Sequence, residues 1–231
     1  MNEDICVITG VGPGTGTALV RKFAERYRVV MLARNEQRLH SLAVKVPGSI
    51  PLICDVADPA ALQTALEEIR ALGAPRVVIH NAVGGGAGDV LALSPQLLQR
   101  NFQINTMALL HLIQAFAPGM VAAGTGAILA TGNTAAYRGR TNFASFAPTK
   151  AAQRILLESA ARLLGPQGVH VAYVAIDAAI DVPWTRKALP DHPDDFFASP
   201  VDIASECFHI AHQPRSTWTF DVVIRPYKET W

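Results

Sequence analysis

Short apolar runs rich in β-branched residues alternate with longer amphipathic segments along this chain, and the alternation limits the folds open to it. Continuous apolar runs are typical of strands covered on both faces, and strand–helix alternation predicts a parallel, doubly wound α/β sheet with right-handed crossovers. The expected strands are residues 5–8, 29–32, 50–53, 77–79, 127–130, 169–174 and 220–224, and the clearest expected helices are 18–26, 60–72, 97–121 and 151–164.

The chain has 231 residues, and half of them are hydrophobic, which is enough to bury one substantial core. It contains no internal repeat, low-complexity tract or interdomain linker, so we expect residues 1–231 to form a single domain. Residues 177–200 are rich in Pro and Asp and join the sixth expected strand to the last helix. Because a long connection at the carboxyl edge of such a sheet is placed to cover a ligand, we predict that this segment covers the substrate.

Charge and cysteine usage argue against several functional classes. Lys and Arg number 20 against 19 Asp and Glu, which gives no electrostatic reason to expect nucleic acid or a membrane surface as partner and favours a small-molecule substrate. The acidic first residues lack the basic start of a secretory signal, which predicts a cytoplasmic protein. Cys6, Cys54 and Cys207 have aliphatic neighbours, as expected for reduced core thiols. No Cys/His spacing indicates a metal site, and no apolar run reaches the roughly 18 residues of a membrane span.

A glycine-rich string, residues 9–16, follows the first expected strand and opens the first helix; its glycines are Gly10, Gly12, Gly14 and Gly16. Glycines at such a place let the backbone approach a pyrophosphate, whose charge is met by amides at the helix N-terminus. A simple strand-to-helix turn is the alternative. The order of strand, turn and helix favours a dinucleotide site.

Further motifs follow this string in a recognisable order. Asp55 and Val56 come after the third expected strand, Asn81 lies in a His-Asn-Ala-Val-Gly sequence after the fourth, and Asn105 lies in the long helix. Together with the TGxxxGxG spacing, this pattern resembles the short-chain dehydrogenase/reductase family over nearly the whole chain.

The resemblance implies a Rossmann-type, seven-stranded parallel sheet in the order 3-2-1-4-5-6-7, with helices on both faces. It also implies an oxidoreductase that acts on a small carbonyl or alcohol and contacts the dinucleotide through Asp55, Val56 and Asn81. Members of the family usually assemble as dimers or tetramers through two long helices, which correspond here to residues 97–123 and 143–165. We therefore expect a homodimer or homotetramer.

The end of the second strand indicates which dinucleotide is bound. An acidic residue there would hydrogen-bond the ribose 2′-hydroxyl, whereas a guanidinium can bind a 2′-phosphate. The chain has Ala33 and Arg34 at this place, which favours NADP(H). The alternative is that Arg34 is a solvated arginine at the start of a helix.

In regular members of the family a Tyr shuttles the proton, a Lys four residues later lowers the pKa of that Tyr, and a Ser thirteen residues before the Tyr binds the substrate oxygen. Alignment on Lys150 places Phe146 at the Tyr position and Asn133 at the Ser position. Asn105 matches the asparagine that completes this group through a water relay. Two of the four catalytic positions therefore carry a different residue.

The region after the sixth strand also departs from the family pattern. Asp177 and Ala178 replace the usual Pro-Gly, and Val182 stands where a Thr often contacts the carboxamide. We assign Ile180, in the same segment, to the cofactor site.

A positioned general acid or base contributes about 10²- to 10⁴-fold to the rate, and one oxyanion-type donor about 10²- to 10³-fold. Loss of both should leave little turnover by the usual route, although contributions of coupled residues are not additive. Lys150 can still bind ribose hydroxyls, and the alternative is an exposed helix lysine.

Two residues are candidate substitutes for the missing acid. Tyr137 lies in the loop after the fifth strand and has a phenol; the alternative is an aromatic ring that covers this loop. Asp177 lies near the expected nicotinamide end, where burial could raise its pKa; the alternative is a helix or turn cap. Three histidines in apolar stretches are expected to be packed residues without a catalytic role: His80, His111 and His170.

The sequence thus leaves two hypotheses open. The first is an atypical NADP(H)-dependent reductase in which Tyr137, Asp177 or water supplies the proton. The second is a non-catalytic NADP(H)-binding protein with a structural or regulatory role, which the joint replacement at Phe146 and Asn133 motivates.

Overall fold

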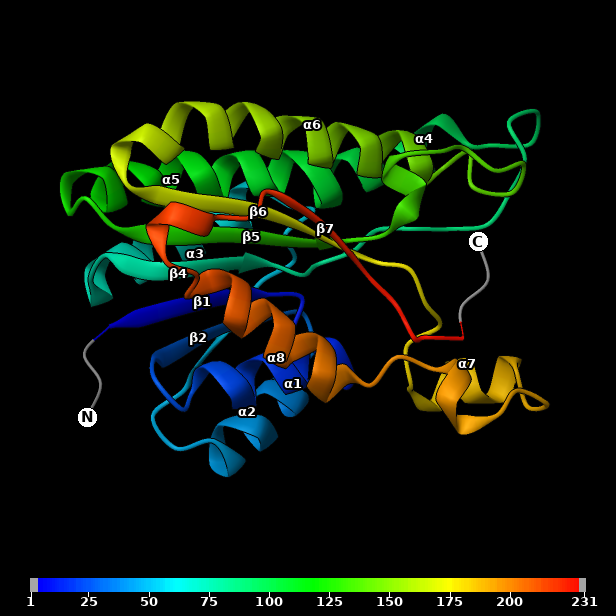
Figure 1. Ribbon diagram of the computed structural model, residues 1–231, viewed down its shortest axis with the longest axis horizontal. Coiled ribbons are helices and arrows are strands. Elements are labelled where there is room, and N and C mark those ends of the chain that lie inside the picture. The colour runs from blue at the N-terminus through cyan, green and yellow to red at the C-terminus, as the bar shows by residue number, and fades with distance from the viewer. Residues whose placement is uncertain (1–3, 229–231) are drawn as a thin grey trace.

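The computed structural model describes residues 4–228 and contains a seven-stranded, all-parallel sheet (Figure 1). The strand order is β3-β2-β1-β4-β5-β6-β7, which confirms the predicted topology. Because the order reverses between β1 and β4, a crevice is expected at the carboxyl ends of these strands. The strands are β1 (Ile5–Thr9), β2 (Arg28–Ala33), β3 (Ile50–Ile53), β4 (Pro75–His80), β5 (Gly126–Gly132), β6 (Val169–Ile176) and β7 (Asp221–Ile224).

Helices cover both faces of the sheet, and each face has its own apolar core. Figure 1 shows α5 and α6 over one face and α1, α2 and α8 over the other. The first core joins buried side chains of α3, α5 and α6 to the sheet, and the second joins those of α1, α2 and α8. The helices are α1 (Thr15–Phe23), α2 (Glu36–Lys45), α3 (Pro59–Leu72), α4 (Pro95–Phe102), α5 (Ala108–Ala122), α6 (Ala147–Leu164), α7 (Pro183–Ala188) and α8 (Pro200–Ala211).

The predicted helix 97–121 is not one continuous α-helix, and this part of the prediction was wrong. A π-helical segment, Gln103–Met107, separates α4 from α5. Polar contacts hold this segment to the sheet: the Ile104 carbonyl lies 3.0 Å from Nε2 of buried His80, and the Asn105 amide donates to the Gly84 carbonyl at 2.8 Å. Single π-helical turns within α-helices are frequently found at functional sites.

Local sequence explains where several helices begin. The side chains of Asn35, Asp58 and Ser94 accept hydrogen bonds from backbone amides in the first turns of α2, α3 and α4. Such caps satisfy amides that have no partner within the helix. Helix α6 starts at Ala147, four residues before the predicted start, so that Lys150 lies in its first turn.

The segment Pro95–Ala122 is long and apolar enough to cross a membrane by length and composition alone, contrary to the expectation that no such run exists. A core helix passes the same test, and α5 contributes Leu109, Leu112 and Phe116 to the apolar core beneath it. The three cysteines are buried free thiols, as predicted.

Candidate functional site

The crevice at the switch between β1 and β4 is a cavity of about 520 Å³, hereafter the first cavity. It lies at the carboxyl edge of the sheet, and its walls come from the glycine-rich turn, the ends of β2 and β4, and the segment after β6. Nine of the ten residues assigned to the cofactor line it: Gly10, Gly12, Gly14, Gly16, Arg34, Asp55, Val56, Asn81 and Ile180.

The glycines of the turn meet different surroundings. Gly10 has φ +70°, and a Cβ there would lie 2.4 Å from the Cα of Ala82. A Cβ on Gly16 would lie 2.6 Å from the Gly10 carbonyl oxygen, and one on Gly14 would lie 2.6 Å from Cγ1 of Val182. At Gly12 the nearest atom would be 4.0 Å away. Folding therefore requires glycine at positions 10 and 16, whereas the space beside Gly12 is open to a ligand.

Asn81 fixes the glycine-rich turn to the neighbouring strands. Its Nδ2 donates to the Gly10 carbonyl at 2.9 Å, and its Oδ1 accepts from the Thr131 hydroxyl at 2.9 Å. The amide group thus holds the shape of the first cavity from the β4 side.

Two arginines, Arg34 and Arg38, line the cavity at the end of β2 and the start of α2. Both are exposed, and neither side chain forms a hydrogen bond or ion pair with another residue among 4–228. Sequence reasoning missed Arg38, which lies in the first turn of α2, four residues after Arg34. Two unpaired guanidiniums at this place are suited to a phosphate.

Asp55 lies at the far end of the first cavity and is held by its neighbours. Its Oδ2 accepts from the Arg100 guanidinium at 3.0 Å, and its Oδ1 accepts from the Ala57 amide at 3.0 Å. Desolvation acts to raise the pKa of this carboxyl, but the two hydrogen bonds outweigh it and the pKa lies below its usual value. Asp55 is therefore a fixed anion that can accept a hydrogen bond from a ligand.

These residues fit a phosphorylated dinucleotide. The glycine-rich turn brings bare backbone and the N-terminus of α1 to the cavity, where a pyrophosphate is favoured. The free guanidiniums of Arg34 and Arg38 lie at the second-strand end, where a ribose 2′-phosphate is expected.

A second cavity, of about 320 Å³, adjoins the first, because Ala178 and Ala179 line both. Asn133, Phe146 and Asp177 line it. The position where the pattern of motifs places the reaction is thus a hollow beside the first cavity, with an apolar ring, an amide and a carboxylate on its walls.

Lys150 is one of the largest fully buried side chains among the described residues, with 2% of its surface exposed, so the alternative of an exposed lysine is wrong. Its Nζ donates to Gln153 Oε1 at 2.9 Å and to the Thr131 carbonyl at 3.3 Å. Burial lowers its pKa to about 7. Lys150 does not line the first cavity, so a ribose contact requires its ammonium to turn away from Gln153.

Asn105 and Gln153 complete this buried network. Asn105 Nδ2 donates to Thr149 Oγ1 at 2.8 Å, and Gln153 Nε2 donates to the Asn105 carbonyl at 2.8 Å. The Gln153 amide therefore connects the Asn105 backbone directly to Lys150. Sequence reasoning missed Gln153, which lies one helical turn after Lys150 in α6.

Comparison with known proteins identifies the chain's relatives. The family model for short chain dehydrogenases matches residues 4–191. The chain belongs to the short-chain dehydrogenase/reductase family. It is 32% identical to D-erythrulose reductase of Gallus gallus and 30% identical to L-xylulose reductase of Homo sapiens, in each case over 167 residues, 71% of this chain and 67% of that protein.

Solved structures give the same fold over the whole length. A metagenomic short-chain oxidoreductase in complex with NADP is 26% identical, with a TM-score of 0.84 and 99% of both chains covered. L-sorbose reductase from Gluconobacter frateurii, complexed with NADPH and L-sorbose, is 24% identical, with a TM-score of 0.86 over 98% of this chain and 96% of that chain. The second likeness supports the short-chain dehydrogenase/reductase fold alone.

Asn133, which the sequence predicts at the usual Ser position, has a structural role. Asn133 Oδ1 accepts from the Ala135 amide at 3.1 Å and caps the 3₁₀ turn Thr134–Ala136. The Asn133 carbonyl accepts from Tyr173 at 3.3 Å. Only the Nδ2 group of Asn133 remains to donate to a ligand in the second cavity.

Tyr137 and Asp177, the two candidates for the proton donor, differ in their position relative to the second cavity. Tyr137 does not line the second cavity; its hydroxyl donates to Asp221 in β7, and the Arg154 guanidinium lies 5.1 Å from its ring centre. Desolvation and the Asp221 carboxylate raise the pKa of this phenol. Asp177 does line the cavity, and its Oδ1 accepts from Thr134 Oγ1 at 2.6 Å. Of the two candidates, only Asp177 therefore lines the second cavity.

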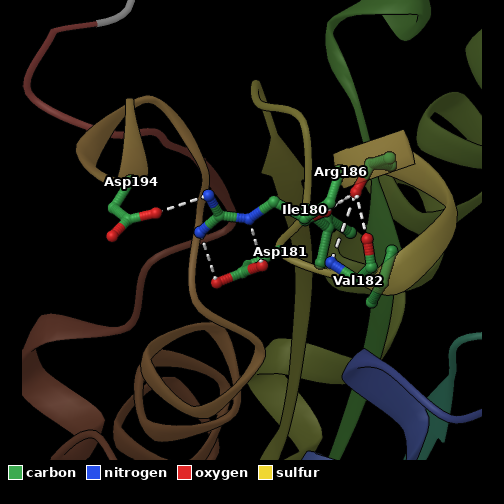
Figure 2. A network of polar contacts seen from close by, with 6 residues as sticks. Ile180, Asp181, Val182, Arg186 and Asp194 are labelled. Atoms are coloured by element: carbon green, nitrogen blue, oxygen red, sulfur yellow. Dashed lines mark hydrogen bonds and ion pairs between the residues drawn. The ribbon is translucent and has the colours of Figure 1, made fainter. Parts of the chain in front are cut away.

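The segment after β6 borders both cavities and is held by ion pairs (Figure 2). The Arg186 guanidinium donates from Nε and Nη2 to the two Asp181 oxygens at 2.7 and 3.0 Å, and from Nη1 to Asp194 at 2.6 Å. It also lies 4.1 Å from the ring centre of Phe197. This clamp closes the segment on itself beside Ile180.

Proposed function

We propose that this chain is an NADP(H)-dependent oxidoreductase that acts on a small carbonyl or alcohol, with catalysis that is weaker than in regular family members. The single observation that carries the proposal is that the two cavities adjoin, with Ala178 and Ala179 lining both. The first presents the glycine-rich turn with Arg34 and Arg38, and the second holds Asn133 and Asp177 directly beside it.

The cofactor, when bound, supplies or accepts the hydride. We assign the glycine-rich turn and the N-terminus of α1 to its pyrophosphate, Arg34 and Arg38 to its 2′-phosphate, and Asp55 with Val56 to its adenosine end. Ile180 and Val182 exclude water from the opposite wall. The segment 177–200 covers the substrate.

Within the second cavity, the chain's own groups orient the substrate and move the proton. Asn133 Nδ2 can donate a hydrogen bond to the substrate oxygen, but an amide does not exchange protons at a useful pKa. Asp177 is the only carboxylate that lines this cavity among the described residues, so we assign proton transfer to its side chain. Phe146 forms an apolar wall where a phenol would otherwise stand.

A second candidate function is a non-catalytic NADP(H)-binding protein in which the dinucleotide stabilises the fold or controls a partner. Three observations favour it: Phe146 cannot exchange a proton, Asn133 caps a turn, and Tyr137 is bonded to Asp221 outside the second cavity.

We further propose a cytoplasmic, single-domain protein that forms a homodimer or homotetramer through the α4–α5 and α6 layer. Ile155 and Leu163 support this assembly, because these large apolar side chains of α6 are 55% and 66% exposed. Their spacing of eight residues places them on one face of the helix.

Titration with NADPH and with NADH, followed by calorimetry, tests cofactor binding. We expect NADPH to bind more tightly, by at least about tenfold, because charge-assisted hydrogen bonds to the phosphate each contribute about 1.5–3 kcal/mol. Arg34→Gln with Arg38→Gln should remove this preference, while Arg21→Gln, a remote exposed arginine on α1, should not. Absence of binding by either dinucleotide would contradict both candidate functions.

A second experiment separates the enzyme from the binding protein. Single-turnover oxidation of NADPH with a carbonyl substrate is measured for the parent, for Asp177→Asn and for Tyr137→Phe. Loss of a parental activity in Asp177→Asn alone supports the assignment above, and loss in Tyr137→Phe alone transfers the role to the phenol. If the parent is inactive but Phe146→Tyr with Asn133→Ser gains carbonyl reduction, the parent is the non-catalytic binder.

A further inference from the structure

Two arginines in the loop before α6, Arg138 and Arg140, lie at the second cavity. Arg138 and Arg140 both line this cavity, and both are exposed. Neither side chain forms a hydrogen bond or ion pair within the described part of the chain. By contrast, Arg154 nearby pairs with Asp221 at 2.6 Å.

From this arrangement we propose that the second cavity binds a carbonyl compound that carries a carboxylate, with Arg138 and Arg140 as the residues that select the anion. The proposal rests on the proposed function, because it names the substrate class of the same site. Guanidinium groups bind carboxylates through paired, charge-assisted hydrogen bonds, so two adjacent arginines provide more donors than a neutral substrate needs.

The remaining walls define the rest of the ligand. Three phenylalanines line the same cavity: Phe143, Phe146 and Phe196. We therefore expect the body of the substrate to be apolar and planar. Asp177 directly precedes Ala178 and Ala179, which line both cavities, so we place the reacting carbonyl beside Asp177. The carboxylate is then placed at Arg138 and Arg140, and the Asn133 amide remains to donate to the carbonyl.

Among residues 4–228, Asp177 is the only carboxylate that lines this cavity, and its charge opposes an anion. Its Oδ1 already accepts a hydrogen bond from Thr134, and it is a single charge against two guanidiniums. The balance of charge on the walls remains positive, which favours a monoanion over a neutral or cationic ligand.

The arginines also line a hollow on the outer side of their turn, together with Tyr137 and Ala147. Phe146 does not line this outer hollow, whereas it lines the second cavity. The two locations can therefore be distinguished by a change at Phe146.

The test uses phenylglyoxylate and its uncharged methyl ester, which share one aromatic α-carbonyl body. Calorimetry measures the binding of each to the full chain, with and without saturating NADP. We expect phenylglyoxylate to bind at least about tenfold more tightly than the ester, the size of one charge-assisted interaction. Arg138→Gln with Arg140→Gln should remove this difference and leave ester binding within about twofold, and Arg21→Gln should change neither.

Phe146→Trp, which reduces only the second cavity, should weaken both probes. Equal affinity for the two probes, binding of neither, or an unchanged phenylglyoxylate affinity in the double arginine variant or in Phe146→Trp would each overturn the inference. Thermal unfolding of every variant checks that it is folded. NADP binding is measured in a separate titration. Failure of the cofactor proposal would therefore appear as absent NADP binding, whereas failure of the anion site would appear only in the binding of the two probes.

Discussion

Lys150 carries an ammonium group into the interior without a carboxylate beside it. Its Nζ lies 5.8 Å from the centre of the Phe146 ring and is bonded only to a carbonyl and to the Gln153 amide. The sequence predicts Phe146 at the position where regular family members have the phenol on which this lysine acts. Burial of this ammonium therefore lowers the stability of the folded state, and Phe146 gives the lysine no phenol to act on.

The first prediction concerns this cost. In the unfolded chain a lysine titrates near pH 10.4, whereas burial lowers the pKa of Lys150 to about 7. Between these values the unfolded chain holds a proton that the folded chain has released, so the free energy of unfolding rises with pH. Below pH 7 both states are protonated and the penalty is fully present.

Between pH 7 and 10, the free energy of unfolding of the parent should rise by about a few kcal/mol relative to that of Lys150→Met. Urea unfolding at several pH values measures it. Lys45→Met, an exposed lysine on α2, serves as the control and should run parallel to the parent. Parallel curves for Lys150→Met would show that the buried lysine does not titrate in this window.

The second prediction compares two glycines of the same turn. Gly10→Ala should destabilise the fold by about 1–2 kcal/mol from the left-handed backbone alone, and by more from the clash with Ala82. Gly12→Ala meets no atom closer than 4.0 Å, so its stability should stay within about 0.5 kcal/mol of the parent. Because the added methyl projects toward the space for the pyrophosphate, Gly12→Ala should nevertheless weaken NADPH binding.

Denaturant unfolding and calorimetry separate the two effects. A Gly12→Ala variant that binds NADPH as the parent does would remove the pyrophosphate from this turn. A Gly10→Ala variant of parental stability would show that the turn adopts another conformation.

At the scale of the elements, the segment after β6 decides how the two cavities are covered. The Asp181 amide donates to the Ala198 carbonyl at 2.8 Å, and the Ala198 amide donates to the Ala179 carbonyl at 2.9 Å, which forms a small bridge across the segment. Arg186 pairs with Asp181 and Asp194 next to this bridge. The ion pairs are at the surface, so they are sensitive to salt.

The third prediction is that Arg186→Gln opens this bridge. Hydrogen exchange of the Asp181 and Ala198 amides should become several-fold faster, and high salt should bring the parent close to the variant. Arg162→Gln, which breaks an ion pair to Glu158 on α6, is the matched control and should leave these amides unchanged. Equal protection in Arg186→Gln and the parent would mean that the apolar contacts of Val182 hold the segment alone.

The sequence correctly predicted those element bounds that depend on the local pattern of residues. Strand β3 has the predicted bounds, and β6 extends only two residues beyond its predicted end. The break in the helix around Asn105 was not predicted, because its cause is a set of polar contacts to Gly84 and His80 from another part of the chain. The hydrophobic period continues through the π-helical segment and gives no sign of it.

The same distinction holds at the site. The glycine-rich turn and Arg34 were predicted because they follow strands at fixed spacing. The direction of Tyr137 was not, because it depends on Asp221, 84 residues later in the chain. The hydrogen bond between Lys150 and Gln153 depends on burial, which spacing alone does not reveal.

At the scale of the whole molecule, two apolar cores on opposite faces of the sheet leave the carboxyl edge free for both cavities. The outer face of α6 is one of the places where large apolar side chains remain in water. Ile155 and Leu163 lie there eight residues apart. Burial of such side chains against a second copy gains about 1.5–3 kcal/mol for each one that is fully covered.

The fourth prediction follows from this face. The parent should sediment as a dimer or tetramer, and Ile155→Glu with Leu163→Glu should shift it toward monomer, because a carboxylate buried without a partner is strongly unfavourable. Val44→Glu alters an apolar side chain of α2 that is 82% exposed, and should leave the assembly unchanged. A monomeric parent, or a glutamate variant that keeps the parental mass, would exclude this face as the contact between copies. Since α6 also carries Lys150 and begins next to Phe146, a change in assembly that alters NADPH affinity would link the contact between copies to the site.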